Sequence, residues 1–165
     1  MAKIYDVQLT DLNKMIAAFK SESDRGAAVL AGGHVDNGLA MYLKWRVRNK
    51  EVSGEVFGGF GPLSSFHQRI VCAYAFGFIE KSDYEDLMLI KDIRNHFAHH
   101  PFDTTFSTDY VGERVKKLST VDLGVAATAS TAAERNRWAY LIACSMRTAR
   151  LHMAMGKKSM KGGKG

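Results

Sequence analysis

Residues capable of chemistry are most concentrated between Arg94 and Pro101. Three of the six histidines in the chain lie here, at His96, His99 and His100, within six residues after Arg94. An arginine offers a planar fork for phosphate oxygens, and a histidine can take up or release a proton near neutral pH. These two groups suffice for metal-free RNA cleavage, in which an imidazole moves the 2′-hydroxyl proton and a guanidinium stabilises the charge gathering on phosphorus.

Helical spacing limits which of these residues can act together. Arg94 and His99 are five residues apart. On a regular α-helix, at about 100° per residue, their side chains point roughly 140° away from each other. They converge only if the helix frays before Pro101, or if a second copy of the chain supplies the partner group.

Two other interpretations of this segment remain open. His99 and His100 can bind the last free carbonyls of a helix and favour its negative end, while Arg94 pairs with a carboxylate, for which Asp24 is a candidate. His96 and His100 also have the spacing of two metal ligands on one helical face, but no nearby Cys, Glu or third His completes a site. We therefore predict no metal and no cofactor.

Two further motifs favour structure over chemistry. The stretch Phe57-Gly-Gly-Phe-Gly-Pro62 lacks the Gly-Lys-Ser/Thr ending of a phosphate-binding loop. We expect residues 49–63 to form a loop whose Phe57 and Phe60 pack on the bundle. The most basic stretch, residues 44–50, falls at the predicted end of a long helix, where cations complement the helix dipole, so direct DNA reading is not favoured.

Apolar periodicity predicts the elements that must position these residues. Apolar side chains recur every three to four positions, and no stretch alternates with period two over more than a few residues. We expect helices after Thr10, from Ser23 or Asp24, after a capping box at 65–68, after a second capping box at 82–85, over 111–118, and after Thr131. Pro101 ends the fourth helix at His99 or His100. The sequence thus predicts an all-α, single-domain bundle of about five to six helices.

Two of these helices carry the clearest buried faces. The face expected for the second helix includes Ala28, Ala31, Val35, Leu39 and Tyr42, and that for the last helix Trp138, Leu141, Ile142, Ser145 and Ala149. The second helix also contains small residues, among them Gly32 and Gly38, that would let another helix approach closely.

Composition bounds the class of protein. The 165 residues are 46% hydrophobic, enough for one folded domain, and carry a net charge of +6. Four of the positive charges are lysines in residues 156–165, which leaves +2 over 1–155. We expect a helical domain over 1–155 followed by a disordered basic tail over 156–165, so the charge is poor support for nucleic-acid binding.

Several features place the chain in the cytoplasm. Cys72 and Cys144 lie in apolar helical stretches without a partner motif and are expected to be buried, reduced thiols. The N-terminal residues lack the apolar stretch of a secretory signal, and no apolar run approaches the roughly 20 residues of a membrane span, so we expect no membrane association.

Three blocks resemble the mannitol repressor (MtlR) family of bacterial regulators. They are Ser21–Leu30, Phe60–Phe66 leading to Ala73–Ile79, and Leu89–His99, in that order, within about 19–118. The resemblance implies an all-helical, self-associating domain named for repression of a sugar-alcohol operon, in a family without an obvious DNA-reading motif.

The segment from Arg94 to His99 is also similar to the Arg-x4-His pattern of HEPN domains, helical modules that often act as metal-independent ribonucleases in toxin and defence systems. This resemblance implies a phosphate role for Arg94, an acid–base role for His99 and a polar position at Asn95. His100 supplies a second register, five residues after the arginine.

Two hypotheses of function follow. The leading one is an MtlR-type transcriptional regulator that acts as a homodimer or higher homo-oligomer, chiefly through contacts with a regulatory protein partner. The competing one is a HEPN-like RNA-cleaving or RNA-binding protein that uses Arg94 and His99. RNA and DNA are also potential partners.

Overall fold

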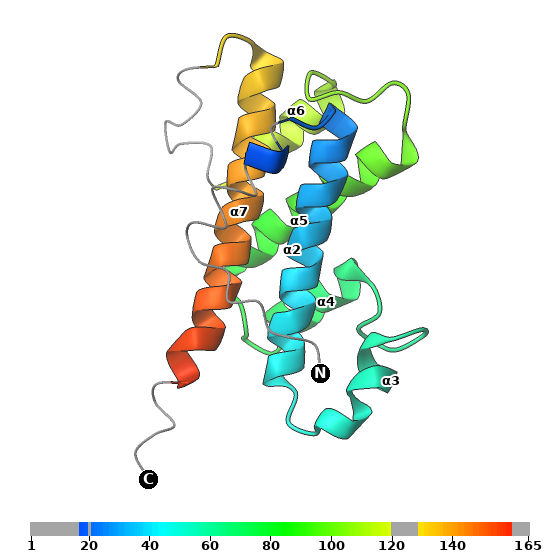
Figure 1. Ribbon diagram of the computed structural model, residues 1–165, viewed down its shortest axis with the longest axis vertical. Helices are drawn as coiled ribbons and strands as arrows, with labels where there is room; N and C mark the ends of the chain where they lie inside the picture. Colours follow the sequence, from blue (N-terminus) through cyan, green and yellow to red (C-terminus); the bar gives the residue numbers. More distant parts are fainter. Residues whose placement is uncertain (1–16, 20, 120–128, 160–165) are drawn as a thin grey trace.

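The computed structural model describes residues 17–19, 21–119 and 129–159, and every regular element in these ranges is helical. In chain order they are α2 (Asp24–Arg46), η1 (Lys50–Val52), α3 (Ser53–Phe57), α4 (Phe66–Ala75), α5 (Lys81–His99), α6 (Asp109–Val115) and α7 (Ala132–Ser159). Figure 1 shows the long helices α2 and α7 side by side, with α5 crossing behind α2. The predicted all-α bundle is confirmed, while the helix expected after Thr10 lies almost wholly outside the described residues.

Helix α2 begins where the sequence predicts because Ser23 caps it. Its Oγ accepts a hydrogen bond from the Gly26 amide at 3.0 Å, which satisfies one of the free amides of the first turn. At the other end, Lys50 Nζ donates to the carbonyl oxygens of Lys44 and, at 3.0 Å, of Trp45. The expected buried face is confirmed, since each of its members is at most 5% exposed: Ala28, Ala31, Val35, Leu39 and Tyr42.

Helices α2 and α7 run parallel. Near their starts, Tyr140 Oη donates to the Ala28 carbonyl at 2.9 Å, and further along both helices a Cβ added to Gly38 would lie 3.7 Å from Thr148 Cγ2. Because the two helices are parallel, the chain must return from the end of α2 to the level of its start before α7 begins. The segment from η1 to α6 makes this connection.

Helix α5 runs antiparallel to both, and it comes closest at Gly32. Tyr42 Oη, near the end of α2, donates at 3.0 Å to the Phe78 carbonyl, just before α5 begins. A Cβ added to Gly32 would lie 2.7 Å from Arg94 Cβ and 2.7 Å from Tyr140 Oη. Three helices therefore meet at a position where only a glycine fits without a shift.

Aromatic rings fill the core beside this junction. Phe97, Phe106 and Tyr140 are each fully buried, with ring centroids 5.0 Å apart for the first two and 5.7 Å for the last two. Tilted rings at these separations pack favourably. They join the end of α5, the loop before α6 and the first half of α7.

The segment 49–63 differs from expectation. The predicted capping box is confirmed, as the Gln68 amide donates to Ser65 Oγ at 3.2 Å and the Ser65 amide to Gln68 Oε1 at 3.0 Å. The prediction that residues 49–63 form only a loop was wrong, because two short helices, η1 and α3, form in this segment. Phe57 is buried as expected, but Phe60 is fully exposed because it lies at the tip of a tight turn with Gly59 at a φ of +52°.

The start of α5 also differs from the start that the sequence predicts. The second capping box was expected at 82–85, but Glu80 is the N-cap and Asp83 is its reciprocal partner. The helix therefore begins with Lys81, while its end at His99, with His100 as C-cap, agrees with the prediction from Pro101.

The buried face of α7 is rotated from the expected one. Leu141 and Ser145 are buried as predicted, whereas Trp138, Ile142 and Ala149 are only partly buried. The most buried positions are Tyr140, Ala143, Cys144 and Thr148, because α7 contacts α2 and α5 together. The helix also continues to Ser159, so the first four residues of the expected tail are helical.

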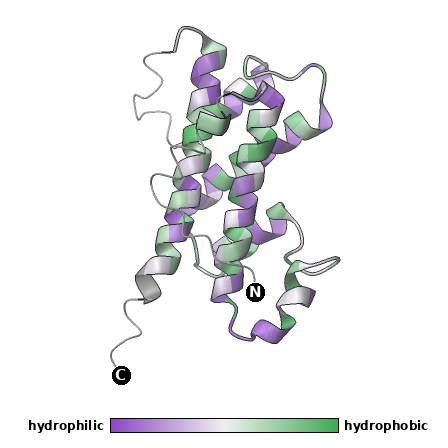
Figure 2. Ribbon diagram, in the orientation of Figure 1, coloured by the Kyte–Doolittle hydropathy of each residue, from purple (hydrophilic) through white to green (hydrophobic). Residues whose placement is uncertain are grey.

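Hydropathy is distributed as this packing requires. Figure 2 shows hydrophilic and hydrophobic residues alternating along the helices, the pattern of helices with one buried and one exposed side. Within the described ranges, none of the helices combines the length and apolar character needed to span a bilayer.

The three-helix junction makes a matched pair of glycine substitutions informative. We expect Gly32→Ala to lower the free energy of unfolding by about 1–3 kcal/mol, because Arg94 Cβ cannot move without shifting α5. At Gly33 an added Cβ would have no neighbouring atom within 4 Å, so Gly33→Ala should raise the free energy of unfolding by up to about 1 kcal/mol. Urea denaturation measures both, and equal effects would contradict the close approach.

Candidate functional site

The end of α5 holds two of the three clustered histidines in local contacts. The backbone amide of His100 donates to the His96 carbonyl oxygen at 3.0 Å, and the ring Nδ1 of His100 lies 3.1 Å from the same oxygen. The His96 ring lies between those of His100 and Tyr110, at centroid distances of 4.4 and 4.1 Å. Burial, followed by the nearby His100 and Arg114, lowers the pKa of His96. This geometry agrees with the interpretation in which His100 closes the helix.

Arg94 lies at the three-helix junction. Its Nη1 donates to Asn95 Oδ1 at 2.8 Å, and its Cβ and Cγ lie against Gly32. Its Nε is buried and has no hydrogen-bond partner in the described part of the chain. Arg94 therefore contributes to packing between α2, α5 and α7, with a guanidinium that is incompletely satisfied.

Asp24 is not the partner of Arg94. Its Oδ1 pairs with Arg137 Nη1 at 2.7 Å, and its Oδ2 accepts from the Phe106 amide at 3.1 Å. The prediction of an Asp24–Arg94 pair was wrong because the carboxylate lies at the start of α2, whereas Arg94 meets the same helix two turns later at Gly32. The carboxylate instead ties the start of α2 to α7 and to the loop before α6.

The structure does not bring Arg94 and His99 together. Helix α5 is regular through His99, so the divergence of about 140° expected for a five-residue separation holds here. His99 is exposed, while Arg94 is partly buried against Gly32. A reaction that used both residues would need a second chain to complete the site.

The helical spacing of His96 and His100 is that of two metal ligands. His96 and His100 stack on each other, and no group of three His, Cys, Asp or Glu side chains gathers into a metal site among the described residues.

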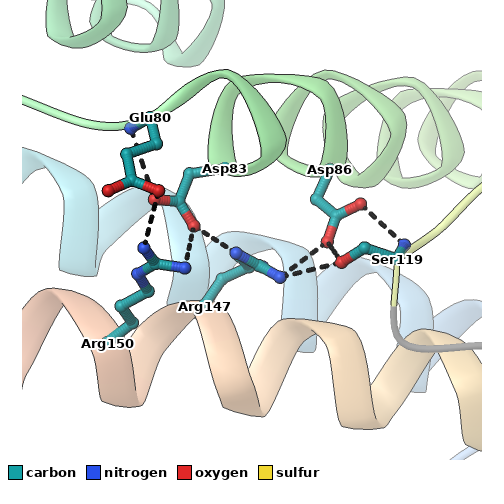
Figure 3. A network of polar contacts seen from close by, with 6 residues as sticks. All are labelled: Glu80, Asp83, Asp86, Ser119, Arg147 and Arg150. Atoms are coloured by element: carbon teal, nitrogen blue, oxygen red, sulfur yellow. Dashed lines mark hydrogen bonds and ion pairs between the residues drawn. The ribbon is translucent and has the colours of Figure 1, made fainter. Parts of the chain in front are cut away.

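The strongest polar cluster is elsewhere, between α5 and α7 (Figure 3). Arg147 Nη1 pairs with Asp83 Oδ1, and its Nη2 lies 2.9 Å from Asp86 Oδ2. The side chains of Arg147 and Asp83 are each 9% exposed, and that of Asp86 is 2% exposed. Ser119 donates to Asp86 from its amide at 3.0 Å and from its Oγ at 2.7 Å, which joins the end of the α6 region to the cluster.

Arg150 and Glu80 extend this cluster to the surface. Arg150 Nη1 lies 3.2 Å from Asp83 Oδ1, and its Nη2 lies 3.3 Å from Glu80 Oε2. A cavity of about 210 Å³ borders the cluster and has Tyr42 and Phe78 in its apolar wall. Because the carboxylates are already paired with arginines, the cluster is suited to holding α5 against α7 rather than to catalysis.

Sequence reasoning missed this cluster, although a signal was present. Asp83 and Asp86 are three residues apart and precede Leu87 and Ile90, so both acids fall on the side of α5 that carries its apolar stripe. A pair of carboxylates on a buried face requires cations, and Arg147 lies within the buried stripe of α7.

The two cysteines are in different environments. Cys144 is 1% exposed, and burial raises the pKa of its thiol well above the ordinary range. Cys72 is only partly buried, which corrects the expectation for this residue, and burial raises its thiol pKa as well.

Comparison with known proteins identifies the family. The model of the family described as mannitol repressor matches residues 50–157, which is more than half of the chain. The chain belongs to the mannitol repressor family. The resemblance of the sequence to this family is thereby confirmed, although the matched range begins after the first block, Ser21–Leu30, and ends at residue 157, within α7.

Two solved structures share the MtlR-like fold. A possible transcriptional regulator, YggD from Shigella flexneri 2a str. 2457T, matches with a TM-score of 0.71 at 11% identity, over 88% of this chain and 99% of that chain. A chain of the MtlR–HPr complex from Escherichia coli matches with a TM-score of 0.64 at 16% identity, over 87% and 97%. No curated protein sequence matches significantly.

Replacing Arg147, the central arginine of the cluster between α5 and α7, should strongly destabilise the protein. Arg147→Met leaves Asp83 and Asp86 buried without their guanidinium, so the free energy of unfolding should fall by about 3–5 kcal/mol. Arg150→Met, at a half-exposed position, should cost about 0–1 kcal/mol. Chemical denaturation of both variants checks this, and adding Asp83→Asn and Asp86→Asn to Arg147→Met should recover part of the loss.

The environment of His34 should make the free energy of unfolding depend on pH. Burial and the neighbouring His152 lower the pKa of His34 below its ordinary 6.5, and its Nε2 is buried without a hydrogen-bond partner among the described residues. The unfolded chain therefore takes up this proton at higher pH than the folded one, so the free energy of unfolding should decline as pH falls below 6.5.

Urea titrations at pH 7.5 and 5.5 measure this decline. We expect His34→Gln to make the difference between the two pH values smaller, while His67→Gln, at an exposed position of α4, leaves it unchanged. An unchanged difference in His34→Gln would exclude His34 as its source.

Proposed function

We propose that this member of the mannitol repressor family is a cytoplasmic transcriptional regulator that acts chiefly through protein contacts and as a homo-oligomer. The observation that carries the proposal is apolar surface left uncovered by the fold. Large apolar side chains are exposed along residues 52–76, and half of the described ones fall there: Val52, Phe60, Val71, Tyr74 and Phe76. Such surface on a small protein is typical of a contact site for other proteins.

Three further observations support the proposal. In the basic stretch at the end of α2, Lys50 is engaged within the fold, where it binds two carbonyls of that helix. The charge outside residues 156–165 is only +2. The compared structures also include a regulator described as possible and a complex with the protein HPr.

Gene expression tests the regulatory role. Deleting the gene should change transcription of a small set of genes, the control of a sugar-alcohol operon being the outcome that the family name favours. A plasmid copy of the chain should restore the original levels, and Arg147→Met, expected to be unstable, should not. An unchanged transcript profile in the deletion strain would refute regulation.

Gel shifts at two salt concentrations test the mode of action. Binding to upstream DNA that vanishes on raising the salt and shows no sequence preference is the result expected for a few exposed lysines alone. Sequence-specific binding by the purified chain, stable at the higher salt, would contradict action through protein contacts.

The HEPN-like alternative is tested with RNA. Because Arg94 and His99 diverge on α5, we expect the purified chain to leave single-stranded and structured RNA intact in the presence of EDTA. Arg94→Ala and His99→Ala serve as matched variants. Metal-independent cleavage that both substitutions abolish, in variants of unchanged stability, would overturn the regulator as the sole function and would indicate a site completed by a second chain.

A further inference from the structure

Helix α4 has two apolar faces, and only one of them is covered. Phe66, Ile70 and Ala73 are buried against the bundle. The second face includes Val71, which is 41% exposed, and continues to Phe76, which is 66% exposed. A helix of a soluble protein normally presents a polar face to water, so a second apolar stripe calls for another element to cover it.

This uncovered face is hollowed into a groove. A hollow of about 670 Å³ lies between α4 and the segment leading from α3, and a second hollow of about 220 Å³ continues toward the end of α2. The two share Leu63, Cys72 and Phe76, so they form one continuous apolar groove. The α4 positions along the first hollow are spaced three and four residues apart, the repeat that matches the ridge of a second helix: Gln68, Val71, Cys72 and Ala75.

The charge of the groove is one-sided. Among the described residues, its lining includes Arg46 at one end and His67 at the other, and no carboxylate. A second copy of the same groove would bring no carboxylate to face Arg46. Carboxylates on an incoming helix would instead meet Arg46 favourably.

We infer that this groove is the docking site for an amphipathic helix of another protein, one whose apolar ridge is flanked by carboxylates. The apolar ridge covers Val71 and Phe76, and the flanking carboxylates face Arg46 and His67. This mode of recognition, a helix laid into an apolar groove, depends on anchors at i, i+3, i+4 and i+7 of the incoming helix. The inference deepens the proposed function, since it rests on action through protein contacts.

Cys72 provides a direct measurement of groove occupancy. It lies in both hollows and is partly exposed, whereas Cys144, the other thiol of the chain, is 1% exposed. A thiol reagent at pH 8 should therefore label Cys72 selectively in the folded, full-length chain. Slower labelling in the presence of a binding partner reports that the groove is covered.

The probe is a synthetic helical peptide with leucines at i, i+3, i+4 and i+7 and glutamates on both flanks. A saturating amount should slow the labelling of Cys72 about tenfold or more, and a matched peptide with lysine flanks should bind at least about tenfold more weakly. Phe76→Glu should abolish protection, which is followed in that variant by peptide fluorescence anisotropy as well as by labelling. Met153→Glu, at an exposed apolar position of α7, should leave protection unchanged.

Three results would overturn the inference. One is equal protection by the acidic and basic peptides, or protection by neither. Another is labelling of Cys72 in the free chain that slows as protein concentration rises, because a second copy then covers the groove. The third is a Cys72 that does not react in the free folded chain at any concentration, because the groove is then already covered.

The outcomes separate this inference from the proposed function. If Phe76→Glu loses the peptide but restores transcription fully in the deletion strain, the chain regulates through another surface and only the groove assignment fails. If the peptide binds as expected but deletion leaves transcription unchanged, the groove is real and the regulatory role fails.

Discussion

The fold depends on the absence of a side chain at Gly32. There α5 and α7 both reach the backbone of α2, with Arg94 Cβ and Tyr140 Oη each within 2.7 Å of the position that a Cβ would occupy. Tyr140 can then bond the Ala28 carbonyl and pack against Phe106, whose ring in turn packs against Phe97. Close approach at this point thus places the aromatic core and the helices that surround it.

The same junction decides the role of Arg94. An arginine beside histidines at a helix end resembles a phosphate-cleaving pair, and the sequence pattern alone is compatible with that chemistry. Packing against Gly32 leaves Arg94 bonded to Asn95 and partly buried, while His99, on a regular helix, remains at the surface. Within the single chain, Arg94 therefore contributes to packing at the junction, and His99 lies apart from it.

The most buried ion pairs of the described residues join helices. Arg147 holds α5 through Asp83 and Asp86, Asp24 joins α2 to α7 through Arg137, and Arg69 bonds Asp36 between α4 and α2. These arginines are thereby occupied inside the bundle. Large apolar side chains remain exposed along α4 and at the turn that carries Phe60, and this surface supports the proposed contacts with other proteins.

Local features of the chain were readable from its sequence, because helix formation depends on neighbours a few residues apart. The caps at Ser23 and Ser65, the buried stripe of α2 and the stop at Pro101 are of this kind, and the family follows from blocks of sequence. Tertiary structure alone decided the rest: the partner of Asp24, the pairing of Asp83 with Arg147, and the exposure of Phe60 and Phe76. These depend on which helices meet and at what rotation, and contacts between residues tens of positions apart leave no periodic trace in the sequence.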